Sequence, residues 1–152
     1  MNCDISFSKP YLCEDELIAR LLSSPEFYDK ETQQVNNEAF NLRTFSDGEK
    51  ESYLSLSRLA FIDKKHLDKK GKYIFRKGYN QYIGYGTFCL KDIAKIKEVR
   101  LFPVKSGAAD HCGLFYFDQN KNLLEGDLTE HPEMFHVIKK LCKVLQKNLF
   151  LK

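Results

Sequence analysis

The chain has 152 residues, of which 43% are hydrophobic and 13% aromatic, so it is long and apolar enough for one folded domain and is excluded from the disordered class. No stretch approaches the roughly 20 apolar residues of a membrane span, and the N-terminus lacks the apolar region of a signal peptide. We therefore expect a single cytoplasmic domain, residues 1–152, that does not bind membranes.

The net charge of +3 is unevenly distributed, because residues 63–77 alone carry seven basic and two acidic side chains. The five cysteines are scattered without any CxxC spacing, which favours reduced thiols over a disulfide framework or a zinc ribbon. No metal site is expected, since His131 and His136 lie five apart at a helix start and match no ligand pattern. The many Lys, Asn, Ile, Phe and Tyr residues are typical of an AT-rich bacterial or phage genome.

In the N-terminal half, Glu14 to Leu22 has leucine and isoleucine at helical spacing with acids in its first turn, so it predicts a helix. Ser24 and Pro25 read as the cap and first position of a second short helix. Glu38 to Arg43 alternates polar and apolar residues and predicts a strand, as do residues 53–59. The polar run Asp63 to Lys72 predicts a solvated loop.

In the C-terminal half, residues 79–85 predict a strand and Leu90 to Ile96 a short helix. Val99 to Phe102 and residues 111–117 predict two strands that flank a polar loop, with Cys112 facing one side of the sheet and His111 the other. The last element is an amphipathic helix that begins near Pro132. Its apolar stripe contains Met134, Phe135, Ile138, Leu141, Cys142, Leu145 and Leu149.

Together these elements predict a single α+β domain with a mostly antiparallel central sheet of about five strands, formed around Phe40, Leu54, Tyr82, Leu101 and Phe115. The C-terminal amphipathic helix would pack on one face of the sheet, and short helices would precede the first strand.

One candidate binding segment is the basic run 64–77. Its lysines could neutralise phosphates and its aromatic rings could stack on bases, which makes single-stranded nucleic acid a candidate ligand. A solvated loop that keeps the protein soluble is the alternative. The residues expected to bind are Lys69, Lys70, Lys72, Tyr73 and Arg76.

The second candidate is the loop 105–111, where Ser106, Asp110 and His111 gather between two strands. A buried structural role is the competing interpretation, with Asp110 capping the turn and His111 bonded inside the domain. We favour contact with a partner for Asp110 and a structural role for His111.

The strand with Arg43, the following strand with Ser55 and Ser57, and a later acid resemble the arrangement in ADP-ribosyltransferase-like folds. The resemblance implies NAD as a cofactor, with Arg43 clamping its pyrophosphate, the serines shaping the nicotinamide pocket and Glu125 or Glu130 as the catalytic acid. An arginine fork suits phosphate.

Residues 38–117 also resemble small uncharacterised bacterial proteins found near defence or toxin genes. The shared pattern is the F-x-L-R of Phe40 to Arg43, the Leu56-Ser57 strand with Arg58, a short helix at 90–96, and the loop from Pro103 to His111. This resemblance implies a binding or accessory protein of a bacterial or phage defence, counter-defence or toxin–antitoxin system, with a protein partner and no cofactor. The sequence leaves open whether the protein is an enzyme.

Overall fold

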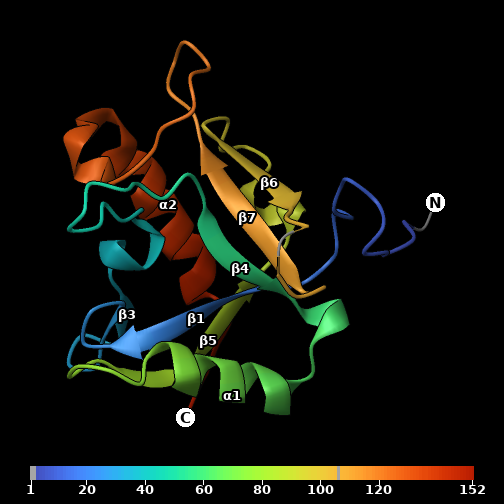
Figure 1. The fold of residues 1–152 in the computed structure, drawn as a ribbon, viewed down its shortest axis with the longest axis vertical. Coiled ribbons are helices and arrows are strands. Elements are labelled where there is room, and N and C mark those ends of the chain that lie inside the picture. The colour runs from blue at the N-terminus through green and yellow to red at the C-terminus, as the bar shows by residue number, and fades with distance from the viewer. Residues whose placement is uncertain (1–2, 106) are drawn as a thin grey trace.

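The structure is a computed structural model that describes residues 3–105 and 107–152. Its centre is a six-stranded sheet with the order β6-β7-β4-β1-β5-β8 (Figure 1), and every neighbouring pair is antiparallel. The strands are β1 (Ile18–Ser24), β4 (Leu54–Arg58), β5 (Gln81–Phe88), β6 (Val99–Pro103), β7 (His111–Tyr116) and β8 (Leu149–Leu151). A separate hairpin pairs β2 (Tyr28–Asp29) with β3 (Gln34–Val35).

Two α-helices accompany the sheet, α1 (Lys64–Ile74) and α2 (Phe135–Gln146). Short 3₁₀ helices connect the strands: η1 (Asn37–Phe40), η2 (Leu59–Phe61), η3 (Leu90–Ile93), η4 (Leu128–Glu130) and η5 (Pro132–Met134).

The two α-helices cover opposite faces of the sheet. In β1, Ile18 and Leu22 belong to the large core that also contains Leu141 of α2. Ala19 and Leu21 point the other way and pack with Leu67 of α1 in a second, smaller core. The prediction of an α+β domain with a mostly antiparallel sheet and a C-terminal helix on one face is therefore confirmed. That helix ends at Gln146, so Leu149, which was predicted in its stripe, begins β8 instead.

The predicted N-terminal helices are wrong. Residues 18–24 form β1, near the middle of the sheet, and no described residue before Asn37 is helical. The Ser24–Pro25 peptide bond is cis, and the chain turns there rather than starting a helix. Because β1 is buried on both faces, its apolar residues do not alternate, and the leucines at helical spacing are equally compatible with a strand. The strand predicted around Phe40 is also wrong, since Phe40 ends η1.

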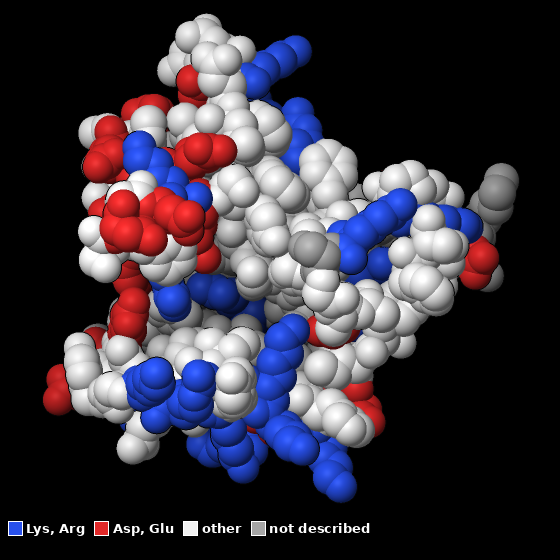
Figure 2. Space-filling model, viewed as in Figure 1, with Lys and Arg blue, Asp and Glu red and all other residues white. Residues whose placement is uncertain are grey.

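The loop predicted at 63–72 is wrong as well, because this segment forms α1. The Asp63 side chain caps the helix by accepting the backbone N–H of His66 at 2.8 Å. Leu67 and Gly71, one turn apart, provide the buried face. The lysines of the basic segment thus lie along a helix, where they form the blue area at the lower edge of Figure 2.

The strands on either side of the 105–110 loop form as predicted. In the β6–β7 ladder, Leu101 pairs with Leu114 and Val99 with Tyr116. Cys112, Leu114 and Tyr116 are completely buried on the side of the large core. His111 and Phe115 occupy the opposite face, where both rings contact Tyr53.

The cysteine prediction is corrected in one respect: Cys3 and Cys13 form a disulfide, while the remaining three cysteines are free and buried. Burial raises the pKa of both Cys112 and Cys142 to about 12.

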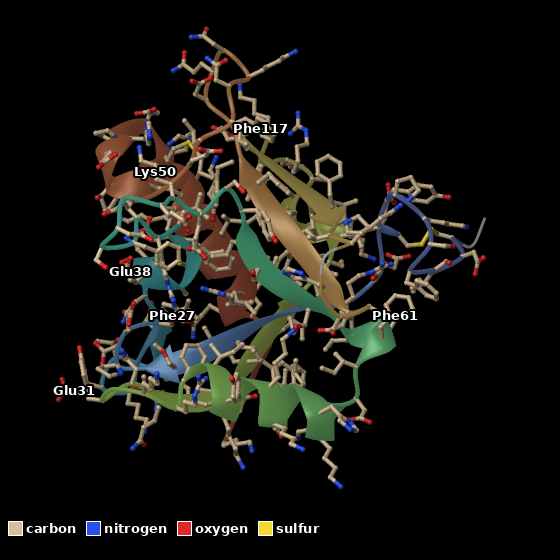
Figure 3. The ribbon with its side chains drawn as sticks, viewed as in Figure 1. Phe27, Glu31, Glu38, Lys50, Phe61 and Phe117 are labelled. Carbon is tan, nitrogen blue, oxygen red and sulfur yellow. A yellow bond between two sulfur atoms is a disulfide. The ribbon has the colours of Figure 1, made fainter. Side chains whose placement is uncertain are left out.

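The N-terminal segment is attached to the sheet through Arg58. The guanidinium of Arg58 makes a two-pronged ion pair with Glu16 and lies 4.6 Å from the centre of the Phe61 ring (Figure 3). An Arg58 N–H also reaches the backbone oxygen of Ser6, at 3.4 Å. Residues 6–16 are therefore part of the fold.

Candidate functional site

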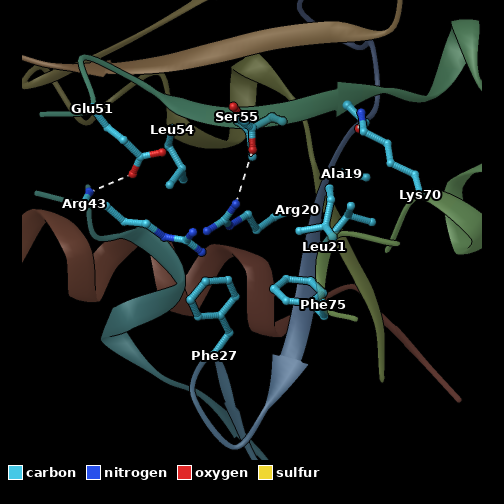
Figure 4. Close-up of a pocket in the computed structure, with 13 residues that line it drawn as sticks. Ala19, Arg20, Leu21, Phe27, Arg43, Glu51, Leu54, Ser55, Lys70 and Phe75 are labelled. Atoms are coloured by element: carbon cyan, nitrogen blue, oxygen red, sulfur yellow. Dashed lines mark hydrogen bonds between the residues drawn. The ribbon is translucent and has the colours of Figure 1, made fainter. Parts of the chain in front are cut away.

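The sheet opens between β1 and β4. These strands pair only at Ile18 with Arg58 and Ala19 with Ser57, whereas β1 pairs with β5 along its whole length. A cavity of about 200 Å³ occupies the resulting gap, and we call it the strand-gap pocket (Figure 4). Its walls are residues 19–21 of β1, residues 54–57 of β4, and Lys70, Ile74, Phe75, Phe27, Arg43 and Glu51.

Arg20 is the central cation of the pocket. Its Nε donates to the carbonyl oxygen of Ala39 at 2.7 Å, and its Nη1 donates to that of Ser55 at 3.3 Å. The guanidinium also lies over the Phe27 ring, 4.7 Å from the ring centre. Burial lowers the pKa of Arg20 from 12.5 to about 10, and the charge of Arg43 acts in the same direction. Arg20 is thus a half-buried cation that donates to neutral carbonyl oxygens, while the nearby charges of Glu51 and Glu26 act on its pKa in the opposite direction and raise it.

Arg43 brings a second guanidinium into the same pocket. A turn closed by the Thr44–Lys50 bridge holds its backbone, and the Glu51 carboxylate accepts the Arg43 backbone N–H at 2.7 Å. The side chain is exposed and points toward Arg20 (Figure 4). Two like charges facing one cavity repel each other, which an anion between them would relieve.

Arg20 and Arg43 differ from the nearby Arg58 in having no carboxylate partner among the described residues. Arg58 is buried against the carboxylate of Glu16, which is the usual way to compensate a buried charge. Within residues 3–105 and 107–152, neither Arg20 nor Arg43 has a carboxylate at ion-pair distance. The strand-gap pocket therefore presents two guanidiniums against the one carboxylate of Glu51 in its lining, an excess of positive charge that suits an anion.

At the end of the pocket that lies away from Arg43, the charge of Lys70 is compensated by that of Asp110. Lys70 Nζ lies 3.0 Å from Ser57 Oγ and 3.0 Å from Asp110 Oδ2. Asp110 is only 4% exposed, and its backbone oxygen accepts the N–H of Arg58. Asp110 therefore fixes α1 to the end of β4, a structural role where the sequence favoured contact with a partner.

His111 pairs with Ser57 in the β4–β7 ladder and lies on the same face of the sheet as Ser57. Its Nε2 is 3.3 Å from the hydroxyl oxygen of Ser55, which is exposed at the pocket wall. The structure thus brings together Arg43, Ser55 and Ser57, three of the residues that the transferase resemblance selects. Glu125 is exposed and does not line the pocket, and the carboxylate present there is that of Glu51.

The remaining predicted residues divide between α1 and the loop. Lys69, Lys72 and Tyr73 are exposed on α1, and Arg76 follows it. Ser106 lies outside the described residues, so its predicted role is not addressed.

The lining residues that sequence reasoning missed include Arg20, Phe27 and Glu51. Arg20 had one signal, since it is a charge inside the otherwise apolar run Ile18 to Leu22.

Three searches give no further assignment. Comparison with protein-family models, with curated proteins and with solved structures finds no match. Within the described residues, no group of three or more His, Cys, Asp or Glu side chains could hold a metal ion. No helix in the described part of the chain is both long and apolar enough to cross a bilayer.

Proposed function

We propose that this chain is a binding protein whose strand-gap pocket receives a small phosphate-bearing molecule. The observation that carries the proposal is the convergence of the Arg20 and Arg43 guanidiniums on one cavity, where no carboxylate of the described residues lies at ion-pair distance from either. Guanidinium groups match the oxygen geometry of phosphate and form charge-assisted hydrogen bonds with it.

The size and lining of the pocket limit the ligand. A cavity of about 200 Å³ is below the 300–1,000 Å³ usual for whole drug-sized ligands. It would enclose a phosphate and its immediate neighbour, with the rest of the molecule outside. Phe27 and Phe75 pack edge to face at 5.7 Å and supply an apolar wall beside the cations.

A transferase acting on NAD is the second candidate, because Arg43, Ser55 and Ser57 share the pocket. In that case Glu51 would replace Glu125 as the acidic residue, and the pocket would take only the phosphate end of NAD. We prefer phosphate binding to the transferase because binding requires only the two cations, whereas the transferase also requires a catalytic carboxylate.

A place in a bacterial or phage defence, counter-defence or toxin–antitoxin system, with a protein partner, rests on the resemblance of residues 38–117 alone. The three free thiols support a cytoplasmic location, whereas the Cys3–Cys13 disulfide is typical of oxidising compartments. Titration of the thiols tests whether the Cys3–Cys13 disulfide forms.

The test of the proposed function is calorimetric titration with inorganic phosphate and pyrophosphate at low salt. Arg43→Gln should weaken binding by about tenfold or more, since a hydrogen bond to a charged group contributes roughly 1.5–3 kcal/mol. The matched control is Arg100→Gln, because Arg100 is an exposed arginine of β6 that donates to the carbonyl oxygens of Lys97 and Val99 and does not line the strand-gap pocket. Absence of binding, or equal binding by both variants, would refute the proposal.

A further inference from the structure

The outer face of α1 is a basic surface that adjoins the strand-gap pocket. Lys64, Lys65, Lys69 and Lys72 are all exposed on this helix. Its one acidic residue, Asp68, is already occupied, since Tyr82 donates a hydrogen bond to it at 2.7 Å and Lys152 pairs with it at 3.4 Å. Figure 2 shows the blue side chains of this region directly below the hollow in the middle of the molecule.

Exposed aromatic rings accompany these lysines. Tyr73 is 64% exposed and Tyr79 is 78% exposed. The Arg76 guanidinium lies 3.8 Å from the centre of the Tyr73 ring and donates to the Tyr73 carbonyl oxygen at 2.7 Å. A flat ring with a cation held over it is a surface on which a base can stack.

The pocket and the basic surface are physically continuous, because α1 contributes to both. Lys70 and Ile74 of α1 line the pocket, together with Phe75, the next residue. The neighbouring positions Lys69, Lys72 and Tyr73 are exposed. A ligand held in the pocket by one end could therefore extend over the surface of α1.

The pocket suits the end of a chain more than its middle. Arg20, bonded to the carbonyl oxygens of Ala39 and Ser55, lines the cavity. A volume of about 200 Å³ leaves no room for a second nucleotide or a paired strand. A terminal phosphate monoester carries up to two negative charges near neutral pH, because its second pKa is about 6. An internal phosphodiester carries one. Two guanidiniums that have no carboxylate at ion-pair distance among the described residues match the terminal group.

We propose that the strand-gap pocket binds the terminal phosphate of a single-stranded nucleic acid, whose following nucleotides lie over the basic and aromatic surface of α1. This inference rests on the proposed function, since it needs the pocket to be a phosphate site. It adds the ligand class and the direction in which the ligand leaves the pocket.

The experiment measures fluorescence anisotropy with labelled single strands of about ten nucleotides, in DNA and RNA forms. Each strand carries a 5′-phosphate, a 3′-phosphate or no terminal phosphate, with the label at the other end. One phosphorylated end should bind about tenfold or more tightly than the unphosphorylated strand. Arg43→Gln should abolish that difference and leave residual binding.

Variants on α1 separate the two parts of the site. The double variant Lys69→Glu/Lys72→Glu should weaken every strand by a larger factor than it weakens pyrophosphate, and it should reduce the salt dependence of strand binding. The matched control is Lys140→Glu/Lys143→Glu, which makes the same charge change at exposed positions of α2. It should leave strand binding much less affected than the α1 variant.

The outcomes distinguish the two proposals. Pyrophosphate binding without any preference for phosphorylated strands would overturn the inference and leave the phosphate pocket standing. A mononucleotide that binds as tightly as the phosphorylated strand would likewise overturn it, because α1 would then contribute nothing. Failure of pyrophosphate and of every strand to bind would overturn both.

Discussion

The buried ion pair between Arg58 and Glu16 gives a test of the fold through the change Arg58→Met. Their side chains are 1% and 0% exposed. Arg58 Nη2 donates to Glu16 Oε1 at 3.0 Å, and Nε donates to the other carboxylate oxygen. Methionine keeps the apolar stem of the side chain and removes the charge, so Glu16 is left buried without its cation.

Breaking a buried pair in this way costs about 3–5 kcal/mol, which is a large part of the roughly 5–15 kcal/mol that stabilises a domain. For a chain of this size, each kcal/mol lowers the melting temperature by about 2–4 °C, so Arg58→Met should lower it by roughly 6–20 °C. The double variant Arg58→Met/Glu16→Leu removes both charges. It should recover most of the lost stability, because apolar replacements of a buried pair are often neutral.

The assay is urea and thermal unfolding of the unaltered protein, both single variants and the double variant. Arg100→Met, at an exposed arginine, is the control and should change the free energy of unfolding by no more than about 0.5 kcal/mol. A single variant within about 1 kcal/mol of the unaltered protein would show that Glu16 reaches water. A double variant as unstable as the singles would show that packing, and not the unpaired charge, sets the loss.

Helix α1, the Asp127 cap and the cysteines each give a further test. Gly71→Ala should destabilise the protein by about 1–2 kcal/mol in urea melts although alanine favours helices, because the new Cβ would overlap the Tyr82 ring; Lys72→Ala on the exposed side should not. The Asn41 side chain and the Thr129 N–H and hydroxyl donate hydrogen bonds to the carboxylate of Asp127 and lower its pKa. The ionised Asp127 therefore stabilises the fold at pH values above its unfolded pKa of about 3.9. This stabilisation is lost as the pH falls through the lower pKa of the folded state. Asp127→Ala should therefore cost about 1–2 kcal/mol at pH 7 and progressively less toward pH 2, and a loss that does not change with pH would contradict this. In denaturant, a thiol reagent should detect three cysteines without reductant and five with it, and should react slowly with the native protein; five without reductant would exclude the disulfide.

The sequence predicted the elements whose pattern reflects one buried face. β7 alternates between Cys112, Leu114 and Tyr116 in the core and His111 and Phe115 outside it, and α2 has a continuous apolar stripe. Such elements carry their own packing information, because their periodicity identifies the face that meets the core.

The missed elements lack that information for different reasons. β1 is buried on both faces, so Ile18, Ala19, Leu21 and Leu22 form an apolar run without alternation. In α1 only Leu67 and Gly71 are buried, and the many lysines hide the helical spacing. Its N-terminal signal was nevertheless present, since Asp63 caps the first turn.

The candidate site was predictable only in part. The resemblance to transferases selected Arg43, Ser55 and Ser57, and all three line the pocket although Arg43 lies in a loop and not in the strand predicted for it. The position of Arg20 beside them depends on where β1 and β4 separate, which is a property of the whole sheet. No local pattern encodes it.

The side chain at position 20 supports the proposal that the pocket binds an anion. Arg20 follows Ile18 by two residues and precedes Leu22 by two, and both neighbours face the large core. An apolar side chain at position 20 would extend that core face and would avoid placing a cation beside it. The chain instead holds a guanidinium of lowered pKa, bonded to two carbonyl oxygens and facing a second arginine. A charge of this kind lowers the stability of the free protein. An anion bound between Arg20 and Arg43 would remove this unfavourable electrostatic free energy, and the gain would appear as binding affinity. This is the reason for proposing a binding function for the gap between β1 and β4.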